Sequence, residues 1–82
     1  MKSITQKKDE CFFFADNYGW EEFDFQDNIG MVSYVKGDFR INIYLTKMTL
    51  GIIKDRKTYY HKKVTPIKLE KIFINPGSFL TK

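Results

Sequence analysis

The sequence predicts an α+β fold: an antiparallel meander of three to four strands, with an N-terminal helix and a short C-terminal helix packed on one face. Three observations predict it. Residues 39–45 alternate between apolar and polar side chains, Gly37 marks a tight turn before them, and Thr65-Pro66 begins an apolar segment with helical spacing. The 82 residues are enough for one small domain, residues 1–82, with a thin hydrophobic core.

The alternating segment is the clearest single element. Strict alternation is typical of a strand that is buried on one side and exposed on the other. The apolar side consists of Phe39, Ile41, Ile43 and Leu45, and the polar side consists of Arg40, Asn42 and Tyr44. The segment is therefore predicted to be a half-buried central strand.

Turn chemistry places the neighbouring strands. Gly37 stands at the first central position of a two-residue hairpin turn, which makes residues 31–36 the preceding antiparallel strand. A tight connection at Thr46-Lys47 would pair Leu45 with Met48, Ile43 with Leu50 and Ile41 with Ile52, although a longer loop stays open because this dipeptide is a poor hairpin turn. A fourth strand, roughly residues 58–63, follows the polar turn at residues 54–57.

Two helices complete the prediction. Thr65 is an N-cap, Pro66 fits the first helical position, and Asn75-Pro76 ends the C-terminal helix. Apolar residues near one helical face predict an N-terminal helix from about Thr5 to Asp16. The segment 22–25 alternates but is too short to be assigned to a strand.

Composition and cysteine usage limit the compartment and the partners. The hydrophobic content of 43% and aromatic content of 17% indicate a folded chain. Cys11 is the only cysteine and is flanked by three Phe, which predicts a buried, inert thiol and no disulfide. We expect a cytoplasmic protein without a membrane partner, because no apolar run reaches about 20 residues and no signal-peptide pattern is present. A thin core leaves a homodimer open.

Part of the chain resembles a group of small, uncharacterised single-domain proteins with an "RINVY…TGTV…LE.IF.NP" run and a segment rich in Lys and Arg. The resemblance covers about residues 39–77 and rests on Arg40-Ile41-Asn42-Ile43-Tyr44, then Thr46, Thr49 and Leu50, and finally Leu69-Glu70-Lys71-Ile72-Phe73 with Asn75-Pro76. The chain departs from the pattern at residues 51–54 and 57–63, where the group has a loop with Cys and His and then a Gly-Lys-Thr run that ends in arginines. The group implies one domain and no particular activity.

Charge divides the chain into two halves. Residues 1–38 hold eight acidic and four basic side chains, whereas residues 39–82 hold ten basic and two acidic ones. Such a split favours either a surface for polyanions or a chain that partly neutralises itself.

The basic half suggests a nucleic-acid-binding module. Exposed tyrosines between cations on a sheet can stack bases and hold phosphates, and a basic hairpin adds an electrostatic rim. The turn at residues 54–57 decides the exposed face: a two-residue turn brings Tyr60 and Lys62 beside Gly51, and a slip substitutes Tyr59 and His61. The candidate residues are Arg40, Asn42, Tyr44, Lys54, Arg56, Lys57, Tyr60, Lys62 and Lys63.

Two alternatives remain open. The same residues are also typical of an ordinary solvated strand, whose lysines protect a sheet edge from aggregation. Alternatively, the protein is a small inhibitor or accessory subunit that binds a larger protein partner through an exposed acidic and aromatic segment or a sheet edge. The residues of that segment are Trp20, Glu21, Glu22 and Asp24, although Trp20 and Phe23 are more typical of a core than of a contact surface.

Catalysis has little support in the sequence, and we expect neither an enzyme nor a cofactor. His61 is the only histidine, and no Ser or Cys nucleophile stands at a recognisable spacing from it. The five glycines are scattered, so no phosphate-binding loop is indicated. The acidic segment lacks the spacing of a calcium loop, so no metal site is predicted.

Overall fold

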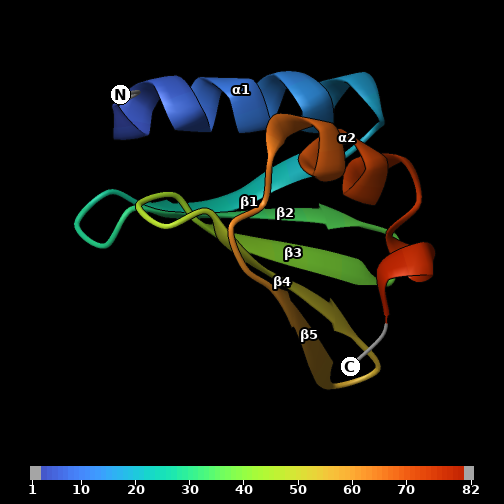
Figure 1. The fold of residues 1–82 in the computed structure, drawn as a ribbon. Helices are drawn as coiled ribbons and strands as arrows, with labels where there is room; N and C mark the ends of the chain where they lie inside the picture. The colour runs from blue at the N-terminus through green and yellow to red at the C-terminus, as the bar shows by residue number, and fades with distance from the viewer. Residues whose placement is uncertain (1–2, 81–82) are drawn as a thin grey trace.

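A computed structural model describes residues 3–80 and shows a helical layer on one face of a five-stranded antiparallel sheet (Figure 1). The strands lie side by side in chain order, which makes the sheet a simple meander. Along the chain the elements are α1 (Ile4–Asn17), β1 (Glu21–Gln26), β2 (Met31–Lys36), β3 (Phe39–Tyr44), β4 (Thr49–Lys54), β5 (Lys57–His61), α2 (Pro66–Ile74) and the 3₁₀ helix η1 (Pro76–Phe79). The predicted fold class is confirmed.

The predicted number of three to four strands is wrong, because β1 adds a fifth. This strand pairs antiparallel with β2, and its register shifts between Glu22 and Asp24. The shift is a β-bulge at Phe23, which interrupts the alternation of side chains. Most of the strand is exposed at the edge of the sheet, so it lacks the apolar pattern that identifies the central strands.

The predicted register of the central strands is confirmed. Ile43 faces Leu50 and Ile41 faces Ile52, and all four side chains are fully buried. The connection between β3 and β4 is longer than a two-residue turn, however, and the paired ladder ends at Tyr44 and Thr49. The predicted pairing of Leu45 with Met48 is therefore absent. Instead, the Leu45 amide donates to the Gly30 carbonyl at 2.7 Å.

The turn between β4 and β5 determines which side chains face outward at the sheet edge. Lys54 pairs with Lys57, which leaves Asp55 and Arg56 as a two-residue turn, and both have positive φ angles of 53° and 67°. Positive φ at both central positions is the geometry of a type I′ hairpin turn. This turn places Tyr60 opposite Gly51, as one of the two predicted registers requires.

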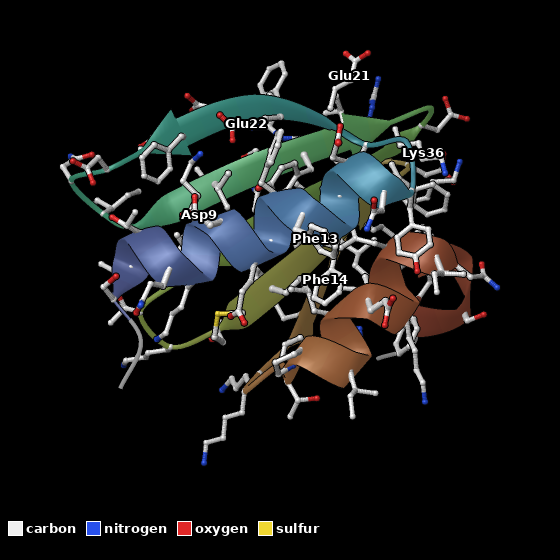
Figure 2. All side chains as sticks on the ribbon, turned by 90° about the horizontal axis from the view of Figure 1, so that it is seen from above. Asp9, Phe13, Phe14, Glu21, Glu22 and Lys36 are labelled. Atoms are coloured by element: carbon white, nitrogen blue, oxygen red, sulfur yellow. The ribbon has the colours of Figure 1, made fainter. Side chains whose placement is uncertain are left out.

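Both helices have the caps that their sequences provide. The Thr65 hydroxyl accepts the Lys68 amide at the start of α2, as predicted. At the start of α1, Ser3 and Gln6 form a reciprocal capping box. Lys36 donates to the Tyr18 carbonyl at 2.6 Å and lies beside the C-terminal end of α1 (Figure 2).

The helical layer is joined to the sheet through Phe73 of α2. Its ring contacts the rings of Trp20 and Tyr34 edge-on, at centroid distances of 5.5 and 5.6 Å. The Trp20 indole N–H also donates to the Phe73 carbonyl at 2.9 Å. The two helices are linked by the Tyr18 hydroxyl, which donates to Glu70 at 2.7 Å, and Figure 2 shows Phe14 between them.

Cys11 lies in the core, and its pKa gives a prediction for alkaline stability. Burial raises the pKa of Cys11 from 9.0 to about 12. The folded protein then holds this proton more tightly than the unfolded chain, so the contribution of Cys11 to stability is complete below pH 9.0 and is lost as the pH rises toward 12. We expect the free energy of unfolding to fall by up to about 4 kcal/mol across this range. Urea unfolding at neutral pH and at intervals from pH 9.0 to 12 measures it.

The matched variant is Cys11→Ala, which removes the titrating thiol. Its unfolding free energy should decrease less steeply above pH 9.0 than that of the wild type. A residual slope is expected from Tyr34, because burial also raises the pKa of its phenol. Equal slopes in the variant and the wild type would show that Cys11 does not titrate as a buried thiol.

Tyr34 provides a second stability prediction. Its ring is fully buried, and its hydroxyl has no hydrogen-bond partner among the described residues. A buried, unsatisfied hydroxyl costs about 1–3 kcal/mol. The substitution Tyr34→Phe keeps the ring contact with Phe73, and we expect it to raise the free energy of unfolding by about 1 kcal/mol. A clear loss of stability in urea unfolding would contradict this prediction.

Candidate nucleic-acid interface

The sheet face opposite the two helices carries the candidate site. No helix among residues 3–80 covers it (Figure 1). We call it the open face. Alternation places on it Met31, Ser33, Val35, Arg40, Asn42, Tyr44, Thr49, Gly51, Ile53, Thr58 and Tyr60, and the bulged part of β1 adds Phe23 and Asp24. The predicted half-burial of the central strand is thus confirmed, since Tyr44 is 39% exposed whereas Ile41 and Ile43 are fully buried.

Tyr60 is the most exposed tyrosine of this face, at 63%. It stands opposite Gly51, and a Cβ atom on Gly51 would lie 3.2 Å from the Tyr60 Cε1 atom and 3.1 Å from the Thr58 Cγ2 atom. The Tyr60 ring therefore lies across the space that glycine leaves free. One side of the ring is supported by the sheet, and the residue remains largely accessible to a ligand.

Arg40 lies on the open face, but a neighbouring ring partly covers it. Its guanidinium carbon is 4.5 Å from the centroid of the Phe23 ring. Phe23 reaches over Arg40 from the bulge in β1 and is itself 59% exposed. The expectation that Phe23 belongs to the core is therefore wrong. The Arg40 Nε atom is buried without a hydrogen-bond partner in the described part of the chain.

Asn42 contributes to the structure of the face more than to its exposed surface. Its side-chain oxygen accepts a hydrogen bond from the Ser33 hydroxyl at 2.6 Å. Ser33 is fully buried, and its hydroxyl also lies 3.2 Å from the Met31 sulfur. Because the side-chain oxygen of Asn42 binds this buried hydroxyl, only the side-chain amide nitrogen is left to contact a ligand.

The predicted basic rim is divided between the two ends of the sheet. Arg56 and Lys57 are exposed at the β4–β5 turn. Lys54 and Lys57 pair directly and belong to the helix-covered side by alternation, and the Lys54 ammonium group lies 5.3 Å from the Phe39 ring centroid. It also lies 3.4 Å from an Asp38 carboxylate oxygen. The predicted place of Lys54 and Lys57 in a rim of the open face is therefore wrong, and the charge of Lys54 is already used within the fold.

Lys62 and Lys63 lie at the other end, where they line a hollow. The hollow is open to solvent, has a volume of about 610 Å³, and is lined by Lys47, Thr49, Lys62 and Lys63; we call it the lysine hollow. Lys47 was not among the predicted site residues. Its only signal in the sequence is its place in the β3–β4 connection, which the meander brings beside the end of β5.

The acidic segment is less accessible than the protein-binding alternative requires. Trp20 is only 4% exposed and belongs to the core, so its predicted role as an exposed contact is wrong. Glu22 forms an ion pair with Lys8 of α1 at 2.9 Å. Glu21 is exposed, and Asp24 is half-buried and accepts a hydrogen bond from Gln26 at 3.1 Å.

The described residues give little support to catalysis, metal binding or a membrane-spanning helix. His61 makes a 2.9 Å hydrogen bond through Nε2 with the Phe79 carbonyl and packs edge-on against the Phe79 ring, so it joins β5 to η1. Within residues 3–80, no group of three His, Cys, Asp or Glu side chains is placed to hold a metal ion. No helix in the same range is long and apolar enough to span a membrane.

Comparisons with known proteins give no functional information. No family model matches the chain, and no curated protein or solved structure matches it significantly.

Proposed function

We propose that this protein binds nucleic acid in single-stranded form, either as a free strand or as the unpaired part of a structured molecule, on the open face of its sheet. The observation that supports the proposal is the arrangement of three exposed aromatic rings on three different strands of that face, with a cluster of lysines at the end where Tyr44 lies. The rings belong to Phe23 on β1, Tyr44 on β3 and Tyr60 on β5. Aromatic rings on an uncovered sheet and cations beside them are the two components of surfaces that bind single strands.

The tyrosines are spaced for separate bases. Tyr44 and Tyr60 lie two strands apart, which corresponds to about 10 Å across the sheet. Rings this far apart do not stack on each other, so each offers a face to a different base. Stacking contributes about 1–3 kcal/mol per base, whatever the base. We therefore expect measurable affinity with little sequence preference.

The lysines hold the backbone in this proposal. Lys47, Lys62 and Lys63 gather at the end of the sheet where Tyr44 lies. Each phosphate that they neutralise releases counterions, with a slope of about −0.7 in a plot of log affinity against log salt concentration for single strands. Three contacts predict a slope of about −2.

The proposal assigns binding and no catalysis, because the only histidine, His61, is held by Phe79 through a hydrogen bond and a ring contact. Binding to a protein partner is less well supported, since two of its four proposed contact residues are buried or paired. Those two are Trp20 and Glu22.

Alanine substitution of the tyrosines tests the proposal. We expect Tyr44→Ala and Tyr60→Ala each to weaken binding of a fluorescent single-stranded oligonucleotide by roughly 5- to 100-fold, because each removes one stacking surface. Fluorescence anisotropy across a salt series measures the affinity. Circular dichroism and urea unfolding check that both variants remain folded.

The matched control is Phe13→Ala. Phe13 is 62% exposed, close to the exposure of Tyr60, but it lies on the helical layer (Figure 2). Its removal should leave the affinity unchanged. The proposal fails if the wild type binds no oligonucleotide at physiological salt, or if Phe13→Ala weakens binding as much as the tyrosine variants do.

A further inference from the structure

The geometry points to the lysine hollow as a binding site for a phosphate monoester, the dianionic group found at a phosphorylated end of a nucleic-acid strand. The inference rests on the proposed function and deepens it, because it says which strands the protein prefers. An internal phosphodiester carries one negative charge, whereas a monoester carries about −1.5 to −2 at neutral pH.

The first support is that the cations of the hollow have no partners of their own. Within residues 3–80, Lys47, Lys62 and Lys63 form no ion pair or hydrogen bond through their side chains. Some other lysines, by contrast, are occupied: Lys8 pairs with Glu22, and Lys36 donates to the Tyr18 carbonyl. Unpaired like charges repel each other, so an anion that enters the hollow removes an unfavourable interaction.

The charged side chains that line the hollow are all positive. None of its four lining residues is acidic. Lys7 of α1 adds a further positive charge nearby, because its ammonium group donates to the Leu45 and Thr46 carbonyls at 3.1 and 3.4 Å, directly before Lys47 in the chain. A dianion gains more from this potential than a monoanion does.

The size of the hollow and the residue beside it suggest what is attached to the phosphate. A volume of about 610 Å³ lies within the range of roughly 300–1,000 Å³ that is usual for small-ligand sites, so it admits a nucleotide as well as its phosphate. Thr49 of the hollow stands opposite Tyr44, where facing Cβ atoms are about 4.5–5.5 Å apart. The base of a terminal nucleotide can therefore stack on Tyr44 while its phosphate contacts the lysines.

The test compares oligonucleotides of one sequence that differ only at their ends. One has hydroxyl groups at both ends, one has a 5′-phosphate and one has a 3′-phosphate. A fourth, one nucleotide longer with hydroxyl ends, controls for the added charge. We expect at least one phosphorylated strand to bind about tenfold more tightly than either hydroxyl strand.

Exposed lysines provide the variants, since their substitution does not disturb the core. Lys62→Gln and Lys63→Gln should reduce the preference for the phosphorylated end to less than about threefold. Lys71→Gln is the matched control, because Lys71 is exposed on α2, in the helical layer. It removes the same net charge and should keep the preference.

The outcomes separate this inference from the proposed function. If all four strands bind equally, or if Lys71→Gln lowers the preference as much as Lys62→Gln, the inference is wrong and the proposed function stands. For the case in which no strand binds, the protein is titrated with adenosine monophosphate and followed by NMR, with adenosine as the control. If no strand binds but the monophosphate alone shifts the Thr49 and Lys62 amide signals, the hollow takes a free nucleotide and the proposed function is wrong. If neither binds, both are wrong.

Discussion

The position of Phe73 is the constraint on which the rest of the molecule depends. Its ring packs against Trp20 and Tyr34, and its carbonyl accepts the Trp20 indole N–H, so α2 is held against the sheet by both ring packing and a hydrogen bond. The Tyr18 hydroxyl joins α1 to the same layer through Glu70. Because both helices lie on one face, no element among residues 3–80 covers the other face, where Phe23, Tyr44 and Tyr60 are exposed (Figure 1).

The structure could be predicted from the sequence where a pattern depends on residues that are close together in the chain. Strict alternation identified β3, and the apolar partners Leu50 and Ile52 determined the register of β4. Pro66 and Asn75 marked the ends of α2 to within a residue. These features are local, so a single sequence contains them.

The errors arose where tertiary contacts decide the outcome. The bulge in β1 turns Phe23 outward onto Arg40, which no spacing rule indicated, whereas Trp20 lies in the core, as its residue type suggested. Lys54 and Lys57 were grouped with the other cations by position in the chain, but alternation places both on the helix-covered side of the sheet. Lys47 was missed because its neighbours in the hollow are distant in sequence.

The meander order has a consequence for how the chain is assembled. Every strand pairs with its neighbour in sequence, so the sheet needs only short loop closures, which carry a small entropic cost. The contact between α1 and α2, by contrast, joins segments near opposite termini of the chain. The protein is thus a series of local hairpins covered by two helices, whose contacts with each other and with the sheet join residues distant in the chain. Both helices contribute buried side chains to the one core, so the loss of either would expose apolar surface that favours aggregation.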